Sequence, residues 1–487
     1  MSKDSKPTVE ELKKSLTLIV GKPNILFSED ATDSPANNQA MQPYLEESRQ
    51  RKMGVAFAVV FPSSTEELAQ VVGTCRFHKV PMIAQGGNTG RCFGCQTDDP
   101  NAVIINLKNM NRIREIDMEN QTITVEAGCI LQDIQNAVTD KGLFFPLSLG
   151  AEGSCQIGGN LATNAGGINV LRYGNARDLT LGIEAVMSNG TVLNELFGLR
   201  KNNTGYDIKN LLIGSEGTLG IISAATLKLF PPESNSEHSF IAVTSVTDAI
   251  KCLQKAQKRF AGKLSSFELM PNIAIEFMEK HSELKCPIGN KHSWYIWYKI
   301  ADANTDKPLF DDNIAFLDEL MTDGLVTDAT VSQNEAMKAL FWQIRETIVA
   351  VQKNEGVSLK FDVSVPISAI PILIDKGIVA AKSICPDIRP YPFGHLGDGN
   401  LHYNFTRPTA MTDDEYLSQY QDKLYETIHD IVDGLDGSFS AEHGIGSQKV
   451  ADMKRYKDPV ALDLMRRIKH SFDPFNLMNP DKVVPKK

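Results

Sequence analysis

Apolar positions between residues 55 and 81 change period twice, which predicts a strand, a helix and a second strand. The run VAFAVVFP at 55–62 is nearly continuous in apolar residues, as in a buried strand. Four apolar residues then recur at i, i+3, i+4 and i+7, the spacing of one helix face. These residues are Leu68, Val71, Val72 and Cys75. Ser63 and Glu66 have the spacing of a capping box, so we expect the helix to begin there.

Beyond residue 85 the chain alternates short β-rich runs, such as TITVEAG and LGIISAATLKLF, with glycine-dense loops. The sequence PPESNS at 231–236 marks a boundary. From about 238 to 433, strand patterns such as SWYIWYKI alternate with longer helical ones, which favours an antiparallel sheet covered by helices. The tail returns to helix. We therefore predict an α+β fold in three segments, 1–233, 234–440 and 441–487.

Composition narrows the classes of function. A chain of 487 residues with 42% hydrophobic residues is long enough for more than one buried core. A net charge of −10 with scattered Lys and Arg makes nucleic acid an unexpected partner. No apolar run reaches the roughly 18 residues of a membrane-spanning helix, and the polar start lacks a secretory pattern. The eight cysteines are widely spread, so we expect reduced thiols and a cytoplasmic location.

Three glycine-rich loops carry the first candidate chemistry. They lie in PMIAQGGNTG at 81–90, GAEGSCQIGGNLATNAGG at 150–167 and GSEGTLG at 214–220. Consecutive glycines let backbone amides close around an anion, and three such loops suit an extended ligand with a pyrophosphate and a ring system. Neither G-x-G-x-x-G after the first strand nor G-x-x-x-x-G-K-[ST] occurs. The alternative is that these glycines only form turns in a β-rich domain.

QGGNTG, IGGNLATNAGG, RYGN and LIGSEGTLGI, in that order, resemble the FAD domain of the vanillyl-alcohol-oxidase type flavoproteins. The resemblance implies a two-part FAD-binding domain over 1–233 with an N-terminal extension. It also implies that the pyrophosphate is held by Gly86, Gly87, Asn88, Thr89 and Gly90. Further residues would lie along the cofactor, namely Pro146, Gly150, Ser154, Gly158, Gly159, Asn164, Gly166, Gly167, Gly217 and Ile222.

The chain departs from this family after Gly90, where Arg91, Cys92, Phe93, Gly94 and Cys95 replace the usual small residues. The lone C-x-x-C is open to interpretation as a metal half-site or a redox pair, but without a second pair nearby two buried thiols are favoured. No histidine occurs in this loop to tether a flavin. We therefore expect FAD to be bound non-covalently.

Histidines carry the second candidate chemistry. GHLGDGNLHYN places His395 and His402 on either side of a turn, and His402 and Asn404 should share one face of a strand. AEHGIG adds Glu442 and His443. Two imidazoles and one carboxylate form the ligand set of a catalytic zinc or a related divalent ion, although a pair of histidines is often a structural pair.

These segments, with FDPFNLMNPDKVVP, resemble the D-2-hydroxyacid dehydrogenases within the same superfamily, most closely those acting on D-2-hydroxyglutarate. The resemblance implies that His395, His402 and Glu442 bind the metal, that His443 is the acid/base, and that Asn404 contacts the substrate. In this interpretation residues 234–440 form a substrate-binding domain, and 441–487 return to the FAD domain.

Two cations upstream form a candidate clamp for a substrate carboxylate. Arg345 lies in a helical pattern and offers a bidentate fork, and Lys360 follows in a strand pattern as a point charge. The alternative is that Arg345 pairs with a surface acid and Lys360 with Asp362. Similarity to the hydroxyglutarate enzymes favours the clamp, but Val349 stands where they carry a threonine. This departure argues against the same dicarboxylate as the substrate.

The sequence thus predicts FAD-dependent oxidation of a D-2-hydroxy acid by hydride transfer, assisted by a divalent metal, with zinc expected first and manganese or cobalt also suited. The electron acceptor would be an electron-transfer flavoprotein or a quinone, and a homodimer is the candidate assembly. A D-lactate enzyme, an oxidase, a flavin-binding electron-transfer subunit and a zinc hydrolase are the alternatives.

Overall fold

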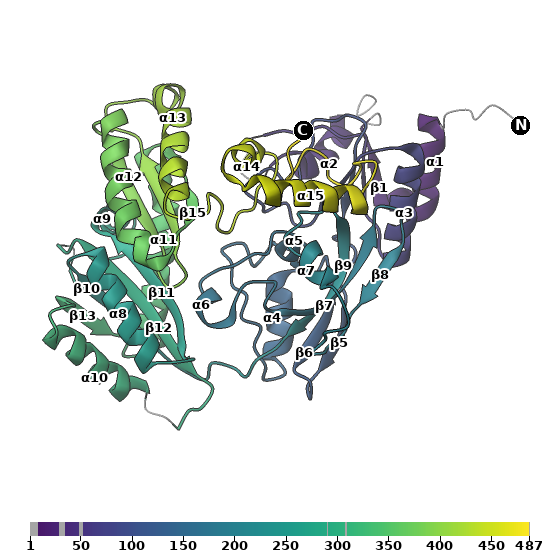
Figure 1. Ribbon diagram of the computed structural model, residues 1–487. Coiled ribbons are helices and arrows are strands. Elements are labelled where there is room, and N and C mark those ends of the chain that lie inside the picture. The colour runs from purple at the N-terminus through teal and green to yellow at the C-terminus, as the bar shows by residue number, and fades with distance from the viewer. Residues whose placement is uncertain (1–7, 29–34, 48–51, 290, 307–308, 487) are drawn as a thin grey trace, which may run out of the picture. The chain divides into compact units, whose positions relative to one another are not determined.

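The computed structural model describes residues 8–28, 35–47, 52–289, 291–306 and 309–486. Its contacts divide the chain into two units (Figure 1). Unit 1 contains the described residues within Met1–Gly167, Gly174–Pro231 and Glu442–Lys487, and unit 2 those within Ile168–Tyr173 and Pro232–Ala441. Both units combine helices and sheets, which confirms the α+β class.

The first sheet of unit 1 has four strands in the order β1-β2-β4-β3. The strands are β1 (Ile25–Phe27), β2 (Ala58–Val60), β3 (Met82–Gln85) and β4 (Val103–Asn106). β2, β4 and β3 are parallel, and β1 is antiparallel to β2. Helices α1 (Val9–Val20) and α3 (Thr65–His78) share a buried core with this sheet. The four residues of the predicted helix face are all buried on α3, which confirms the helix. The order strand, helix, strand is also confirmed, but the second strand, β3, begins at Met82, just beyond the predicted segment.

The start of α3 differs from the prediction by one residue. Ser64 is the N-cap, and its hydroxyl accepts a hydrogen bond from the amide of Glu67 at 3.2 Å. The Glu67 carboxylate accepts hydrogen bonds from the amide and hydroxyl of Ser63. The predicted pair of Ser63 and Glu66 was therefore wrong. Because Ser64 and Glu67 have the same spacing, the pattern alone did not distinguish the two pairs.

The second sheet of unit 1 is antiparallel, in the order β5-β6-β9-β7-β8. Its strands are β5 (Ile113–Asp117), β6 (Thr122–Glu126), β7 (Thr180–Met187), β8 (Val192–Glu195) and β9 (Gly220–Lys228). The remaining helices of unit 1 are α2 (Pro35–Leu45), α4 (Leu131–Thr139), α5 (Ile157–Ala162), α7 (Ile208–Leu212), α14 (Val450–Tyr456) and α15 (Pro459–Phe472). After α15 the chain pairs with β3, because Met82 donates to the carbonyl of Leu477 and accepts from the amide of Asn479.

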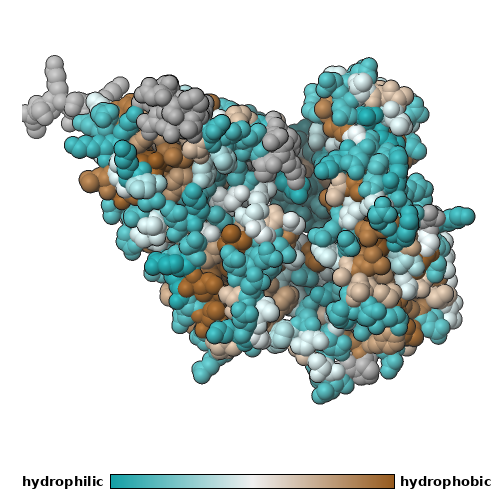
Figure 2. Space-filling view, turned by 180° about the vertical axis from the view of Figure 1, so that it is seen from behind, coloured by the Kyte–Doolittle hydropathy of each residue, from teal (hydrophilic) through white to brown (hydrophobic). Residues whose placement is uncertain are grey.

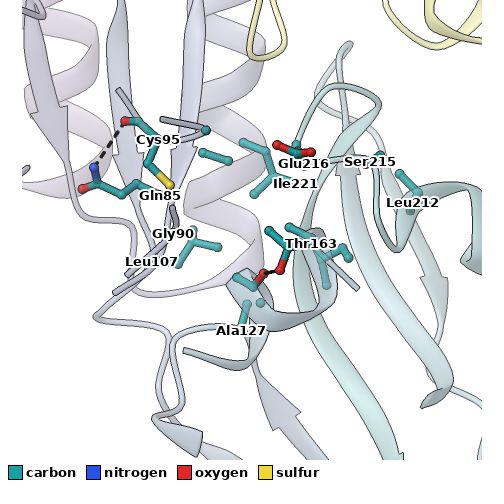
Figure 3. A pocket seen from close by; sticks show the side chains of 18 of the residues that line it. Gln85, Gly90, Cys95, Leu107, Ala127, Thr163, Leu212, Ser215, Glu216 and Ile221 are labelled. Carbon is teal, nitrogen blue, oxygen red and sulfur yellow. Dashed lines mark hydrogen bonds between the residues drawn. The ribbon is translucent and has the colours of Figure 1, made fainter. Parts of the chain in front are cut away.

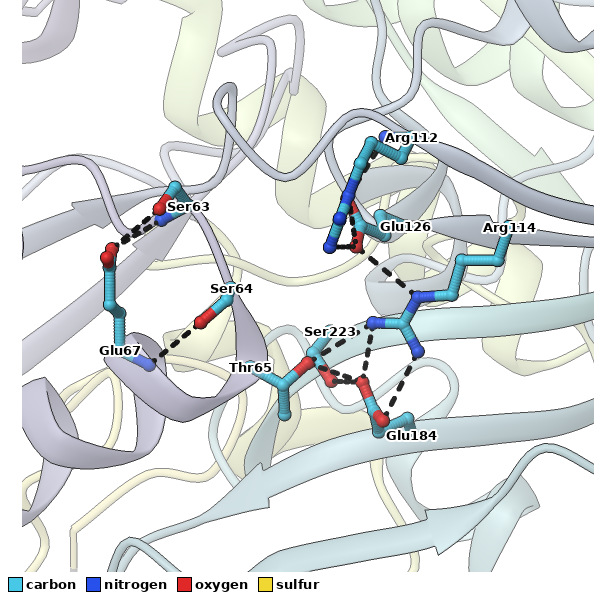
Figure 4. A network of polar contacts seen from close by, with 9 residues as sticks. All are labelled: Ser63, Ser64, Thr65, Glu67, Arg112, Arg114, Glu126, Glu184 and Ser223. Carbon is cyan, nitrogen blue, oxygen red and sulfur yellow. Dashed lines mark hydrogen bonds and ion pairs between the residues drawn. The ribbon is translucent and has the colours of Figure 1, made fainter.

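A polar network connects α3 with the second sheet (Figure 4). Arg114 on β5 contacts the carboxylates of Glu126 on β6 at 3.3 Å and Glu184 on β7 at 3.1 Å. The hydroxyls of Thr65 and Ser223 also donate to Glu184. Both carboxylates therefore have a cation or a donor beside them, which a buried charge requires. The network holds α3 against the second sheet, in which β9 follows directly on the third glycine loop.

Unit 2 is built on one antiparallel sheet, as predicted. The sheet has eight strands, in the order β13-β10-β12-β11-β16-β17-β14 with β15 also on β17. The strands are β10 (Asn235–Val243), β11 (Leu264–Pro271), β12 (Trp294–Asp302), β13 (Asp328–Val331), β14 (Ser358–Leu359), β15 (Asp362–Ser364), β16 (Arg389–His395) and β17 (Asn400–Thr406).

Helices cover both faces of this sheet. One core includes residues of α8 (Val246–Arg259), α10 (Leu309–Thr322), α12 (Ile370–Ile384) and α13 (Asp413–Asp433). The opposite core includes residues of α9 (Asn272–His281) and α11 (Glu335–Val351).

The short helices are η1 (Lys22–Asn24) in unit 1, and η3 (Gln352–Glu355) and η4 (Ile367–Ala369) in unit 2. The segment α6 (Val170–Tyr173) also belongs to unit 2, where Arg172 pairs with Glu233 at 3.1 Å.

Figure 2 shows one face of the surface, where apolar residues form separate patches among hydrophilic ones. Single exposed apolar side chains such as Leu18 and Tyr206 are common on folded proteins. Within the part of the chain that the structure describes, no helix combines the length and apolar character needed to cross a membrane.

Candidate active site

The three glycine loops of unit 1 surround one pocket with about 760 Å³ of empty space (Figure 3). Seven of the residues predicted to bind the cofactor or to act as the acid/base line it: Gly86, Gly90, Gly158, Gly159, Gly217, Ile222 and His443. The pocket therefore brings the candidate acid/base to the same place as residues from all three loops.

The loop at 86–90 offers backbone amides to a ligand. The amide of Gly86 faces the Cys95 thiol, whereas no described residue accepts a hydrogen bond from the amides of residues 87–90. Asn88 has a left-handed φ of +55°, and its side-chain amide donates to the carbonyls of Pro43 and Glu46. The side chain is thus used to hold the loop. Adjacent amides without acceptors form a concave donor set of the kind that binds phosphate oxygens.

Close approach explains why glycine is needed in the loops. A Cβ on Gly87 would lie 2.2 Å from the carbonyl oxygen of Ser154, and one on Gly158 would lie 2.6 Å from the Cβ of Ala127. In the third loop the buried hydroxyl of Ser215 lines the pocket and has no hydrogen-bond partner among the described residues. Anion-binding amides at one loop and an unpartnered donor at another fit the phosphates and polar edge of FAD.

Other predicted cofactor residues lie on or beside the same loops but not among the residues that line this pocket as the structure describes it. They are Gly87, Asn88, Thr89, Pro146, Gly150, Ser154, Asn164, Gly166 and Gly167. Sequence reasoning singled out Arg91, Cys92, Gly94 and Cys95 only as a departure from the family, although all four line the pocket. It gave no role to the other lining residues: Ala84, Gln85, Leu107, Ala127, Ala162, Thr163, Leu212, Ser215, Glu216, Gly220 and Ile221. Many of these flank the glycines directly, which is a signal that was available.

Cys92 and Cys95 of the C-x-x-C segment line the pocket as free thiols. None of the eight cysteines of the chain forms a disulfide. Burial, with a smaller effect of the Glu216 charge, raises the pKa of Cys95 to about 11. A thiol that stays protonated at neutral pH is a poor metal ligand and a poor nucleophile. Cys92 is buried and Cys95 is half-buried, and these observations favour two thiols over a redox pair.

Two hydrogen bonds to Glu216 hold the turn that carries His443. The Glu216 carboxylate accepts hydrogen bonds from the amides of Ile445 at 2.7 Å and Gly446 at 2.8 Å. Burial raises the pKa of Glu216, whereas these two amides act in the opposite direction. The carbonyl of Cys92 accepts from the amide of Ser447 at 3.1 Å. The family departure at 91–95 is therefore in contact with the segment that bears the candidate acid/base.

In unit 2, His395 ends β16 and His402 lies on the neighbouring strand β17. Their rings are 5.5 Å apart between centroids, and each can offer a ring nitrogen within 4.8 Å of the other. Leu401 and Tyr403 pack into the core on one side of β17, so His402 and Asn404 share the opposite face, as predicted. Two convergent imidazoles suit a divalent metal.

A buried acid, Glu268 on β11, joins two of the predicted site residues. One oxygen lies 2.7 Å from Nδ1 of His395, and the other accepts a hydrogen bond of 2.7 Å from Nε of Arg345. Burial opposes ionisation of Glu268, but the neighbouring His395 and Arg345 lower its pKa to about 2. Glu268 was not anticipated. A lone acid in the otherwise apolar end of LSSFELMP was the signal that could have found it.

The proposed clamp residues differ in exposure. Arg345 is buried, and its guanidinium lies 5.1 Å from the centre of the Phe393 ring, which also packs against His402. Its partner is therefore a buried acid, and the alternative of a surface acid was wrong. Lys360 is exposed between β14 and β15.

Two further predicted substrate residues lie in different surroundings. Val349, one turn after Arg345 on α11, has an exposed fraction of 39%. Asn404 is buried, and its amide donates to the side chain of Gln352 at 2.9 Å. This bond holds the Asn404 side chain in place. The role of each toward a substrate stays a prediction.

Glu442 and His443 open the C-terminal part of unit 1, directly after Ala441. The amide of Ala441 donates to the carbonyl of Asp362 at 3.2 Å, and Asp362 pairs with His402 across β15 and β17. Ala441, the last residue of unit 2 before this segment, is thus anchored on the strand next to His402.

Two family models match the chain. A model described as FAD binding domain matches residues 56–195, and one described as FAD linked oxidases, C-terminal domain, matches residues 233–483. Among curated relatives, a mitochondrial D-2-hydroxyglutarate dehydrogenase of Arabidopsis thaliana is 34% identical, over 96% of this chain and 80% of the relative. A D-2-hydroxyglutarate dehydrogenase of Xanthomonas citri pv. viticola is 35% identical, over 88% of this chain and 89% of the relative.

Solved structures share the fold. A substrate-bound p-cresol methylhydroxylase superposes with a TM-score of 0.74 at 16% identity, covering 97% of this chain and 96% of that chain. At this identity the likeness concerns the fold alone.

Proposed function

The chain belongs to the FAD-linked oxidoreductase family of the D-2-hydroxyglutarate dehydrogenases, and we propose that it oxidises D-2-hydroxyglutarate or a similar D-2-hydroxy acid to the 2-oxo acid. The family and the FAD-dependent dehydrogenase class expected from the sequence are thereby confirmed. One observation carries the proposal. His443, the predicted acid/base, lines the same pocket as the three glycine loops.

Unit 1 would hold FAD. The loop at 86–90 would bind the pyrophosphate, chiefly through the amides of residues 87–90, and the second and third glycine loops would lie along the rest of the cofactor, with the contacts predicted from the sequence. Since no histidine occurs at 86–95, we propose non-covalent binding. In terms of the chain, residues 1–233 and 441–487 would serve the cofactor, and 234–440 the substrate.

Unit 2 would supply most of a metal site. From the resemblance to the family, His395 and His402 would each give one ring nitrogen, and Glu442 would give a carboxylate oxygen. The donor set fits zinc, and it also suits manganese or cobalt. When bound, FAD accepts the hydride from the carbinol carbon, and the metal polarises the hydroxyl oxygen.

The residues of the chain would bind the acid and remove its proton. Arg345 and Lys360 would hold carboxylate oxygens, Arg345 through its fork and Lys360 as a point charge. Asn404 would contact the substrate from the same strand face as His402. A ring nitrogen of His443 would take the hydroxyl proton, because a histidine can change charge near neutral pH. The acid thus loses one hydride and one proton, which balances its conversion to the 2-oxo acid.

The reduced flavin needs an acceptor, and we propose an electron-transfer flavoprotein or a quinone. A homodimer is likewise a proposal. The cytoplasmic location stays a prediction, and the Arabidopsis relative is named mitochondrial.

The test is the visible spectrum of the purified protein before and after anaerobic addition of D-2-hydroxyglutarate, D-lactate or D-malate, with and without a chelator. We expect bleaching of the flavin band by one D-acid and no bleaching after chelation. A yellow protein that no acid bleaches would favour an electron-transfer subunit, and peroxide formation on aeration would favour an oxidase. A colourless protein that binds no added FAD would contradict the proposal.

A further inference from the structure

Glu268 contacts both His395 and Arg345 but is itself neither a proposed metal ligand nor part of the proposed clamp. We propose that Glu268 is a positioning residue that orients His395 toward the metal and Arg345 toward a substrate carboxylate. The inference rests on the proposed function, because it concerns the same metal and the same acid. Its evidence is the geometry of the contacts of Glu268 within unit 2.

The contact with His395 selects which ring nitrogen remains for a metal. The Glu268 oxygen lies 2.7 Å from Nδ1, and an ionised carboxylate can only accept a hydrogen bond. Nδ1 therefore carries the proton, and the lone pair of the ring is on Nε2. A carboxylate that holds the second nitrogen of a metal-binding histidine fixes both the orientation and the tautomer of the ring.

The contact with Arg345 selects which edge of the guanidinium remains for a ligand. Nε donates to Glu268 at 2.7 Å, and no other described residue accepts a hydrogen bond from this guanidinium. The two Nη groups therefore stay available as an end-on fork for a carboxylate. Phe393 packs against both Arg345 and His402, so the fork lies beside the histidine pair.

Both roles depend on the charge and burial of Glu268. Its side chain is 1% exposed, and those of Arg345 and His395 are 6% and 9% exposed. Water cannot readily replace a hydrogen bond that is broken at this depth. A neutral amide in its place could accept from only one neighbour, and its NH₂ group would face the N–H of the other.

Unit 2 contains a second buried carboxylate with the same kinds of partner, which gives a matched control. Glu355 on η3 contacts Nε2 of His281 at 2.6 Å and the guanidinium of Arg389 at 2.6 Å, and it also pairs with Lys280. None of these residues belongs to the proposed metal set or clamp. A purely structural role for Glu268 predicts that the two acids behave alike.

The experiment measures zinc affinity of the FAD-loaded protein by competition with a chromogenic chelator, for wild type, Glu268→Gln and Glu355→Gln. We expect Glu268→Gln to weaken zinc binding by roughly 10- to 100-fold. Glu355→Gln should keep the wild-type affinity even if its thermal midpoint falls. Equal zinc affinity in Glu268→Gln and wild type would overturn the inference while leaving the proposed function intact.

A second variant guards against misfolding. The double substitution Glu268→Gln with Arg345→Met removes both charges of the buried pair, so no unpaired charge remains in the interior. It should fold and still show weakened zinc binding, because His395 remains without its carboxylate. Wild-type affinity in the double variant would overturn the inference. A wild-type protein that binds no divalent metal would overturn the metal proposal and this inference together.

Discussion

The carboxylate of Glu216 accepts a hydrogen bond from the amide of Gly446, 230 positions later in the chain. This contact, with the one from Ile445, ties the third glycine loop to the turn that carries His443. A neutral side chain cannot serve both amides in the same way. The position of the candidate acid/base therefore depends on one buried acid of unit 1.

Glu216→Gln should loosen the His443 turn. The NH₂ group of a glutamine cannot accept a hydrogen bond, so one of the two buried amides would lose its acceptor. An unsatisfied buried donor costs about 1 to 3 kcal/mol, so we expect a decrease of that size in unfolding free energy and earlier release of flavin on heating. Flavin fluorescence during a thermal ramp measures this. Glu119→Gln, at an exposed acid of the same unit, is the control and should change nothing. Flavin release at the wild-type temperature from Glu216→Gln would contradict the prediction.

Gly446→Ala should damage the same turn for a steric reason. A Cβ there would lie 1.8 Å from the carbonyl oxygen of Cys92, and the residue has a φ of +53°. Gly142→Ala isolates the conformational part, because Gly142 has a φ of +72° with no atom within 4 Å of a Cβ. We expect a decrease of about 1 kcal/mol in unfolding free energy for Gly142→Ala and several times that for Gly446→Ala. Equal decreases in denaturant titrations would show that the clash is relieved.

His443→Asn should lower turnover by about 10²- to 10⁴-fold while FAD content stays near wild type, because it removes the proton acceptor and little volume. Single-turnover flavin reduction in a stopped-flow instrument measures the effect. His470→Asn, at an exposed histidine on α15, is the control. If His443→Asn reduces its flavin at the wild-type rate, His443 has no part in proton transfer.

Glu355 should make unit 2 sensitive to acid. Burial opposes its ionisation, but hydrogen bonds from Lys280, His281 and Arg389 lower its pKa from 4.5 to about 2. Because the folded state holds the ionised form, the stabilisation is fully present above pH 4.5 and disappears as the pH falls toward 2. The shift corresponds to about 3 kcal/mol at neutral pH.

Glu355→Gln should therefore lower the unfolding free energy at pH 7, and its difference from wild type should shrink by about half at pH 3. Urea titrations of both proteins at the two pH values measure this. A difference that is independent of pH would mean that the ion pairs of Glu355 contribute little.

Local patterns predicted local structure well. The apolar spacing on α3 identified its buried face, and the alternation on β17 placed His402 and Asn404 on one side. The same reasoning placed the N-cap of α3 one residue too early, because Ser63 and Ser64 fit the capping-box spacing equally. It also did not anticipate that α6 belongs to unit 2, where the partner of Arg172 is Glu233, 61 positions away.

The sequence alone predicted the strand and helix periods and the three glycine loops, because these depend on residues a few positions apart. It also offered a set of imidazole and carboxylate groups suited to binding a divalent metal. Folding in three dimensions was needed to bring Glu268 to His395, 127 positions away, and to place Glu216 beneath the turn of His443. Such pairs depend on which strands become neighbours, in which register, and on how deeply they are buried. No spacing along the chain encodes that directly, because a buried acid must take whichever donors the folded interior brings to it.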